Sequence, residues 1–179
     1  MSADGRFVAF ASDASNLVRG DRNQMTDVFI RDRRRGTTTL VSAASSGADG
    51  NGRSFAPATS ADGRLVAFAS EASNIVARDR NAAADVFTWN RRTDRTVRIG
   101  VASDGHGADS WSGVPLISAD GRIVAFASAA RNIAHVPEGS AIRVFLRDIR
   151  RRTTTAIESP EPLSDTGSRT SRLTAAESS

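Results

Sequence analysis

A short apolar segment flanked by turn residues occurs three times along the chain. Residues 60–70 read SADGRLVAFAS, and residues 2–12 and 118–128 differ from them only in the residue that follows the arginine. The three copies begin 58 residues apart. A fixed period of this length indicates a repeat architecture.

Each apolar segment predicts a short β-strand that is covered on both faces. An Asp-Gly pair, which favours a turn, precedes a continuous apolar run in every copy. Because side chains alternate along a strand, Leu65, Ala67 and Ala69 project to one face. Val66 and Phe68 project to the other. The face of small residues predicts close packing against a neighbouring sheet.

Residues that favour β-strands also recur at fixed places after each apolar segment. A long loop leads to a second strand, expected at 27–32, 85–90 and 143–148. A short arginine-rich turn leads to a third strand, expected at 37–41, 96–101 and 153–157. A Gly-rich connection leads to a fourth strand, expected at 55–59 and 113–117. No segment has a helical period, so each repeat predicts a four-stranded antiparallel unit.

Four short strands per repeat are typical of a β-propeller blade. Such blades have roughly 40–45 residues, and the present repeat is longer. The additional residues lie in the loop after the first strand, at 12–26 and 70–84, and in the Gly-rich connection. Because long loops on a rigid scaffold often carry function, these loops are the expected binding surface.

The SADGR turn, the VAFAS strand, the DVF of the second strand and the Arg/Asp turn resemble the TolB-like (WD-repeat-like) β-propeller repeat. The resemblance extends over residues 2–157. It implies an all-β fold and a periplasmic or other extracytoplasmic location. Blades of this kind also form the propeller of prolyl-oligopeptidase-type hydrolases. The Asp-box turn of sialidase propellers differs, because one residue separates its Asp from its Gly.

The chain contains fewer repeats than a closed propeller, which usually has four to eight blades. We predict an incomplete, open propeller over residues 1–157, with repeats at about 2–59, 60–117 and 118–157. The first repeat lacks the strand that should precede it. Open sheet edges invite pairing. We therefore expect missing blades or a protein partner to complete the propeller, and we expect oligomers to form through the open edges.

Residues 158–179 differ in composition from the repeats. They are polar and rich in Pro, Ser and Thr, which predicts a disordered tail. Residues 168–176 fall in register with 110–118 and predict, as an alternative, a poorly matching extra strand.

The composition excludes several kinds of site. The chain has no cysteine, so it forms neither disulfides nor thiolate metal sites. No apolar run approaches the roughly 20 residues that a membrane helix needs. Met1 is followed almost at once by a repeat, so we expect no signal peptide. The net charge of +4 is carried by arginine, because the chain has no lysine.

Arginines cluster in the turn between the second and third strands of each repeat, at 33–35, 91–92 and 150–152. Three basic clusters along one rim would attract nucleic acid, acidic glycan or phospholipid. However, Asp32, Asp94 and Asp148 lie beside the clusters, and aromatic stacking partners are nearly absent. We therefore interpret the clusters as solvated turns and do not expect nucleic acid as a partner.

Two of the long loops share the pattern Asp-x-Asn-x-x-x-Asp, formed by Asp21, Asn23, Asp27, Asp79, Asn81 and Asp85. Several oxygen donors in a short loop suit Ca²⁺, so the pattern predicts one calcium site in each loop. It lacks the Gly and the final Glu of an EF-hand. The alternative is turn chemistry, in which Asp and Asn bond the nearby backbone. The third repeat has Pro137, Gly139 and Arg143 at these positions and predicts no site.

Asn16, Asn74 and Asn132 recur in the long loops, each followed by Leu or Ile. We expect the Asn to cap a turn and the apolar residue to hold the loop against the sheet. These positions therefore predict a structural role rather than a binding one.

No recognisable catalytic constellation is present in the sequence. His106 and His135 are not equivalent in the repeat, and neither a nucleophile elbow nor a phosphate-binding loop occurs. We therefore predict a non-enzymatic binding or scaffold module that contacts a protein or another ligand. Two alternatives remain: the propeller segment of a larger hydrolase, and a structural envelope protein.

Overall fold

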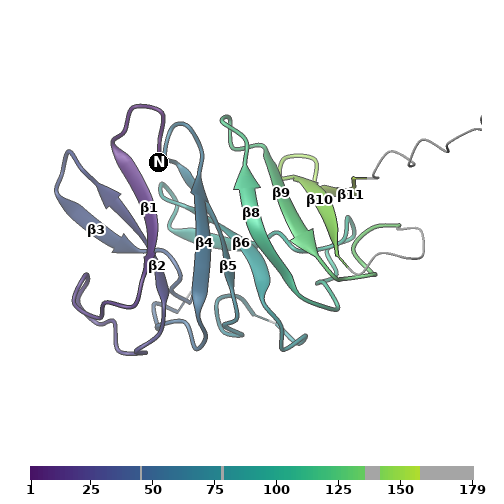
Figure 1. Cartoon of the computed structure of the whole chain (residues 1–179), viewed down its shortest axis with the longest axis horizontal. Helices are drawn as coiled ribbons and strands as arrows, with labels where there is room; N and C mark the ends of the chain where they lie inside the picture. The colour runs from purple at the N-terminus through teal and green to yellow at the C-terminus, as the bar shows by residue number, and fades with distance from the viewer. Residues whose placement is uncertain (45, 78, 136–141, 158–179) are drawn as a thin grey trace, which may run out of the picture.

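The computed structural model describes residues 1–44, 46–77, 79–135 and 142–157. They form three antiparallel β-sheets that stand side by side in an arc (Figure 1), which we call blades 1, 2 and 3 in chain order. Blade 1 contains β1 (Phe7–Ser12), β2 (Asp27–Asp32) and β3 (Thr37–Leu40). Blade 2 contains β4 (Ser54–Thr59), β5 (Leu65–Ser70), β6 (Asp85–Asn90) and β7 (Arg95–Arg98). Blade 3 contains β8 (Ser112–Ile117), β9 (Ile123–Ser128), β10 (Arg143–Asp148) and β11 (Thr153–Ala156).

The all-β prediction is confirmed, and the second strands begin and end at the predicted residues. The third strands are shorter than predicted, most clearly β7, which ends at Arg98 rather than at Val101. The cause is a local irregularity, because the N–H groups of Ile99 and Gly100 both donate to the carbonyl of Val86, at 2.7 and 3.2 Å. The chain leaves the ladder at this point. None of the described residues forms a helix that could cross a membrane.

Each blade is offset from the sequence repeat. The strand order in blade 2 is β4-β5-β6-β7, so the strand that ends one repeat pairs with the first strand of the next. Blade 1 has only the order β1-β2-β3, as expected for a copy with no preceding strand. Its inner edge is therefore β1, which lies next to β4 (Figure 1).

The SADGR segment forms the same hydrogen-bonded turn before β1, β5 and β9. In the second copy, the Ser60 hydroxyl donates to Asp62 Oδ1 at 2.7 Å and accepts the N–H of Leu65 at 3.1 Å. Asp62 Oδ1 also accepts the N–H of Arg64 at 2.9 Å. Gly63 has a φ of +62°, a conformation that glycine adopts without strain. These contacts explain why the repeat keeps Ser, Asp and Gly at fixed spacing.

Adjacent blades pack through two different faces of each sheet. We call them the Phe face, which in blade 2 carries Val66, Phe68 and Phe87, and the Ala face, which carries Leu65, Ala67, Ala69 and Val86. The Ala face of blade 1 packs against the Phe face of blade 2, and the Ala face of blade 2 packs against the Phe face of blade 3. All six residues of β5 are buried, which confirms the prediction of a strand covered on both faces.

The contact between blades is closest at the turn glycines. A β-carbon placed on Gly63 would lie 2.4 Å from the ring of Phe7, and one placed on Gly121 would lie 2.9 Å from Leu65 Cδ1. Each glycine therefore forms a socket for the first residue of the preceding blade's β1 or β5. A larger residue at either position would separate the two sheets.

Candidate functional site

Two grooves open between the outer strands of adjacent blades. The blade 1–2 groove has a volume of about 430 Å³ and lies between the end of β3 and the β6–β7 hairpin. The blade 2–3 groove has a volume of about 650 Å³ and lies between β7 and the β10–β11 hairpin. The two grooves occupy equivalent places in the repeat, so differences in their lining show what is particular to each.

The lining of the two grooves differs in charge. Leu40 and Trp89 line the blade 1–2 groove, and Arg98 and Arg147 occupy the equivalent positions in the blade 2–3 groove. Arg152 is an additional arginine of the blade 2–3 groove, and Arg95 lines both grooves. One groove therefore has a largely neutral wall at these positions, whereas the other is basic.

Arg147 is the most deeply placed of these arginines. Its side chain is buried, and Nη1 donates to the carbonyl of Ala102 at 3.0 Å and to Thr154 Oγ1 at 2.9 Å. Burial lowers the pKa of Arg147, and the neighbouring charge of Arg152 lowers it further. A nearby negative charge would relieve this repulsion.

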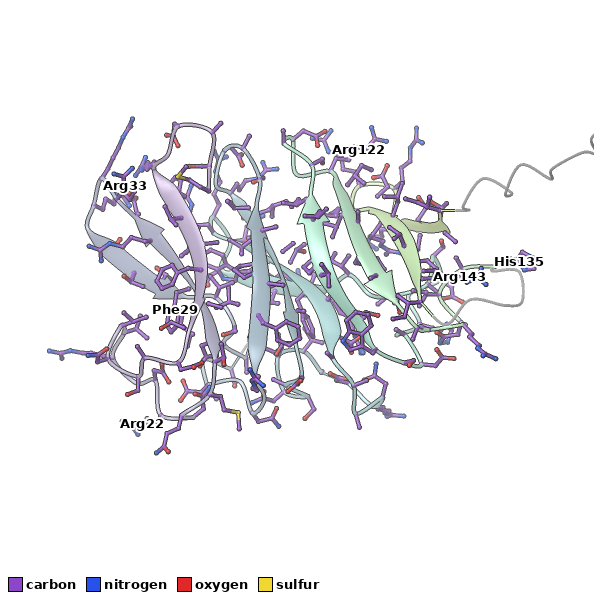
Figure 2. All side chains as sticks on the ribbon, in the orientation of Figure 1. Arg22, Phe29, Arg33, Arg122, His135 and Arg143 are labelled. Carbon is purple, nitrogen blue, oxygen red and sulfur yellow. The ribbon has the colours of Figure 1, made fainter. Side chains whose placement is uncertain are left out.

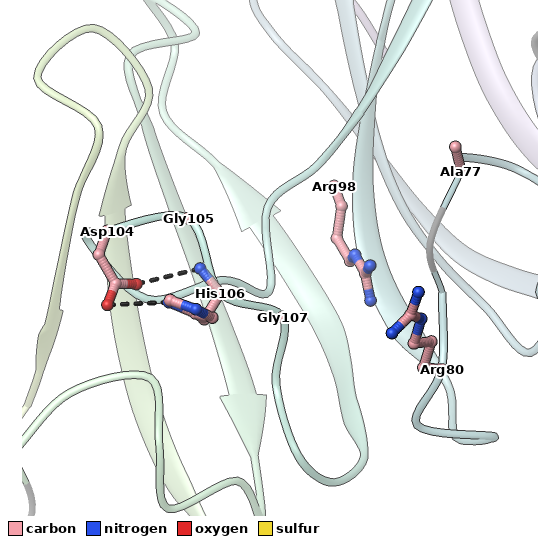
Figure 3. Close-up of a pocket in the computed structure, with 7 residues that line it drawn as sticks. All are labelled: Ala77, Arg80, Arg98, Asp104, Gly105, His106 and Gly107. Carbon is pink, nitrogen blue, oxygen red and sulfur yellow. Dashed lines mark hydrogen bonds and ion pairs between the residues drawn. The ribbon is translucent and has the colours of Figure 1, made fainter.

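A second pocket of about 560 Å³ adjoins the groove and shares Ala77, Arg98, Asp104 and Gly105 with it (Figure 3). Arg80 and Arg98 extend into it from one side, and His106 lies on the other (Figure 3). The pocket is built from the long loop and the Gly-rich connection, the two segments that make the repeat longer than a typical blade. The loops that were expected to form the binding surface therefore line a pocket, together with Arg98 of β7.

His106 lies in the predicted turn at the edge of this pocket. Its Nδ1 is 3.0 Å from Asp104 Oδ2, and its backbone N–H donates to Asp104 Oδ1 at 3.0 Å. These two hydrogen bonds lower the pKa of the Asp104 carboxyl. Both side chains are exposed, so the pair forms part of the outer wall of the pocket.

The Asp-x-Asn-x-x-x-Asp loops adopt the turn structure that was considered as the alternative to calcium. In the first loop, Asn23 Oδ1 accepts the N–H of Met25 at 2.9 Å. The Asn23 amide donates to Asp27 Oδ2 at 2.7 Å and to the carbonyl of Gly50 at 3.0 Å. The second loop repeats these contacts through Asn81. Among the described residues, no group of three or more acidic or His side chains is arranged to hold a metal ion.

An arginine serves as the counter-ion of the second loop. Arg98 Nη1 lies 3.0 Å from Asp85 Oδ2 and 3.4 Å from Asp79 Oδ1. Asp85 is fully buried, and burial raises its pKa to about 6. The charge of Arg98 opposes this increase, and the charge of Asp79 adds to it. The predicted metal ligands Asp79 and Asp85 are therefore already paired with a cation.

Within the part of the chain that the structure describes, the first loop has no such counter-ion, because Leu40 stands where the second repeat has Arg98. Asp21 is only 9% exposed, and its Oδ1, like Oδ1 of Asp85 in the second loop, has no hydrogen-bond partner among the described residues. Burial raises the pKa of Asp21, and the charges of Asp27 and Asp49 raise it further. The two loops therefore share their turn structure but differ in electrostatics. Residues 137 and 139 of the third loop lie outside the described residues.

The recurring asparagines connect loops to one another. Asn74 Oδ1 accepts the N–H of Asn51 at 2.9 Å, and its amide donates to the carbonyl of Asp49 at 2.9 Å. Asn132 makes the equivalent contacts in the next repeat. The following residues Ile75 and Ile133 are buried in the core. These contacts agree with the predicted structural role. The asparagine was expected to cap a turn, whereas its side chain joins two loops.

The arginine turns and the long loops lie along opposite edges of the blades. Figure 2 shows Arg33 and Arg122 along the edge with the arginine turns and Arg22 along the edge with the long loops. At the edge with the arginine turns, the adjacent aspartates form ion pairs with arginines of the SADGR turns. Arg6 donates from Nε and Nη2 to the two oxygens of Asp32, at 3.0 and 2.7 Å. Arg122 donates from the same two atoms to one oxygen of Asp148, Oδ2, at 2.9 and 2.7 Å. These ion pairs hold the pKa of Asp32 well below its usual range and lower that of Asp148 to about 2.

Arg98 and Arg147 were not among the site residues predicted from the sequence. Aligning the repeats would have revealed them, because positions 40, 98 and 156 carry Leu, Arg and Ala, and positions 31, 89 and 147 carry Arg, Trp and Arg. The sequence therefore did contain a signal: at these two strand positions, the residue type changes from one repeat to the next.

No family model matches the chain, and no curated protein matches it by sequence. Solved β-propeller structures do match it. The putative TolB from Agrobacterium tumefaciens is 22% identical, with a TM-score of 0.54 over 87% of this chain and 46% of that one. The β-propeller domain of the Trilobed protease from Pyrococcus furiosus is 13% identical, with a TM-score of 0.53 over 88% of this chain and 40% of that one. Dipeptidyl peptidase 4 from Porphyromonas gingivalis is 18% identical, with a TM-score of 0.51 over 89% of this chain and 25% of that one.

These similarities show the fold. The chain is a partial β-propeller of about three blades and resembles TolB and the propellers of peptidases. It spans less than half the length of each of these three proteins.

Proposed function

We propose that the chain is a non-enzymatic binding or scaffold module whose contact surface is the blade 2–3 groove with its adjoining pocket. The observation that carries the proposal is the difference between equivalent grooves, in which Leu40 and Trp89 are replaced by Arg98 and Arg147. The blades share one scaffold, so this change gives the blade 2–3 groove a positive charge that the equivalent positions of the blade 1–2 groove lack.

The chemistry of the groove favours an extended acidic ligand. Arginine binds carboxylates through two parallel hydrogen bonds and is more weakly hydrated than lysine. The exposed Arg95 and Arg152 are available for such contacts, and the apolar side chains of Val97 and Ile149 line the same groove. We infer that a segment of a partner protein with acidic and apolar side chains binds there.

Reversing two of the exposed charges should weaken this binding. A fluorescently labelled oligoglutamate peptide is the probe, and the double variant Arg95→Glu/Arg152→Glu should lose about tenfold in affinity, roughly 1.4 kcal/mol. Fluorescence anisotropy at fixed ionic strength measures the change.

The matched control makes the same change of charge away from the groove. Arg34→Glu/Arg35→Glu lies in the exposed turn of blade 1 and should bind almost as well as the wild-type chain. Equal weakening by both double variants would show that only the net charge matters and would rule out the groove as the site.

A second candidate function is the propeller segment of a larger hydrolase. It is supported by the similarity to propellers of peptidases and by the small share of those proteins that the chain spans. A hydrolase domain encoded next to this chain would favour this function.

We also propose one cation site, in the first acidic loop only. The buried, unpaired oxygen of Asp21 and the charge of Asp27 support the proposal for this loop. In the second loop, Arg98 already supplies the positive charge, so the prediction of two sites is narrowed to one.

Calorimetric titration with calcium should therefore find about one site per chain. Calcium favours several oxygen ligands, and only in the first loop do the carboxylates lack an arginine counter-ion within the described residues. Asp21→Asn should abolish binding, and Leu40→Arg should abolish it by introducing the counter-ion of the second loop. Asp79→Asn, the matched control, should leave binding intact. An absence of heat together with an unchanged Tm in the wild-type chain would refute the site.

A further inference from the structure

The two end blades expose the two halves of an interface that the chain forms twice internally. Among the described sheets, none covers the Phe face of blade 1, where Val8 and Phe10 are half-buried. Likewise, no described sheet covers the Ala face of blade 3, which carries Ile123, Ala125, Ala127 and Val144. These residues are the repeat equivalents of those that pack together between blades 1 and 2 and between blades 2 and 3.

Equivalent side chains are more exposed on the two end faces than in the middle blade, because the end faces have no neighbouring sheet among the described residues. Val86 on the Ala face of blade 2 is 0% exposed, whereas its equivalent Val144 on blade 3 is 44% exposed. On the Phe face, Phe68 of blade 2 is fully buried and Phe10 of blade 1 is only half-buried. Each end therefore presents apolar surface that the middle blade hides.

The backbone of the SADGR turns adds a directional contact. The N–H of Ala3 donates to the carbonyl of Ala61 at 2.8 Å, and the N–H of Ala61 donates to the carbonyl of Ala119 at 2.9 Å. At the two ends of this series, the N–H of Ala119 and the carbonyl of Ala3 have no partner within the described residues. One donor and one acceptor are thus left in matching positions.

The glycine sockets show the same pattern. Phe7 fills the socket at Gly63, and Leu65 fills the socket at Gly121. A β-carbon at Gly5 would meet only the ends of two flexible side chains, Arg33 and Met1, at 3.7 and 3.9 Å. Ile123, the equivalent of Phe7 and Leu65, is only half-buried at the opposite end of the arc.

From these matches we propose that the Ala face of blade 3 in one copy of the chain packs on the Phe face of blade 1 in a second copy. Ala119 of the first copy then donates to Ala3 of the second, and Ile123 enters the socket at Gly5. In a pair related by a twofold axis, the contact forms twice and closes a ring of six blades. Six lies within the usual range for propellers.

This assembly is independent of the proposed binding function. The blade 2–3 groove lies between two blades of the same copy and includes none of the end-face residues named above. A failure of either proposal would therefore leave the other standing.

Light scattering on the purified chain, after gel filtration over a range of concentrations, tests the proposal. We expect a mass of twice 18.9 kDa at high concentration. Ala125→Arg on the Ala face and Phe10→Arg on the Phe face should each give a monomer. Met25→Arg, at an exposed loop position that belongs to neither face, should remain a pair.

Mixing the two monomeric variants distinguishes a head-to-tail contact from a contact between like faces. Each variant keeps one intact face, so an equimolar mixture of Ala125→Arg and Phe10→Arg should form a weaker mixed pair. A like-face contact would respond to only one of the two substitutions and would overturn the proposal. A wild-type chain that stays monomeric, or that grows beyond two copies, would also overturn it.

Folding of the variants is checked by circular dichroism and urea unfolding. Both replaced side chains are partly exposed in the single chain, so arginine can reach solvent at either position. If Ala125→Arg does not fold, Val144→Asp places a charge at an exposed position on the same face. The expected result for this variant is again a monomer.

Discussion

Replacing Arg98 with leucine, the residue at the equivalent position of the first repeat, should lower the free energy of unfolding by about 3–5 kcal/mol at pH 7. Arg98 lies against two buried carboxylates, at 3.0 Å from Asp85 Oδ2 and 3.4 Å from Asp79 Oδ1. Removing one partner of a buried ion pair leaves the opposite charge without compensation. Urea unfolding monitored by circular dichroism measures the loss.

The effect should depend on pH in a defined direction. The pKa of Asp85 is raised from 3.8 to about 6, so the folded state binds its proton more tightly than the unfolded state. The wild-type chain should therefore lose stability as the pH rises from about 4 to about 6, by about 3 kcal/mol in total. Without Arg98 the pKa of Asp85 rises further, so the decline should continue to higher pH.

The difference in stability between the wild-type chain and Arg98→Leu should thus be small near pH 4 and largest above pH 7. Arg95→Leu, an exposed arginine on the same strand, is the control and should change stability by no more than about 0.5 kcal/mol at any pH. A loss that is the same at pH 4 and pH 8 would show that Arg98 stabilises the chain by packing alone.

The strands could be predicted from the sequence because their causes are local. The Asp-Gly turn before Leu65 and the apolar run after it are adjacent in the chain, and both determine the strand. The assignment of strands to blades was less accessible. The 58-residue period does not show at which strand a blade begins. The boundary between blades depends on the pairing of β4 with β5 across the repeat boundary.

The candidate site was harder to predict because it depends on contacts between distant segments. Arg147 reaches the carbonyl of Ala102, 45 residues earlier in the chain. The spacing of Asp79, Asn81 and Asp85 indicates oxygen donors, but it does not show that Arg98 from another strand already pairs with them. Charge compensation of this kind is visible only once β6 and β7 are paired.

Replacing Phe68 with alanine should lower the free energy of unfolding by about 3–5 kcal/mol, because it leaves a cavity between two sheets. The Phe68 side chain is fully buried, and its ring stacks on Phe87 with 5.6 Å between ring centroids. Phe10, the equivalent residue of blade 1, stacks on Phe29 at 5.7 Å but lies on the open Phe face. Phe10→Ala should therefore remove only about 1–2 kcal/mol from a single chain, within the range of ordinary substitutions.

The repeat provides the control for this comparison. Phe126 stacks on Phe145 at 5.7 Å, and the Ala face of blade 2 covers it as the Ala face of blade 1 covers Phe68. Phe126→Ala should therefore resemble Phe68→Ala in urea unfolding at low protein concentration. Equal losses at all three positions would mean that the stacked pair, rather than the neighbouring blade, provides the stability. If the end faces join two copies, the loss from Phe10→Ala should rise with protein concentration, whereas the other two losses should rise much less.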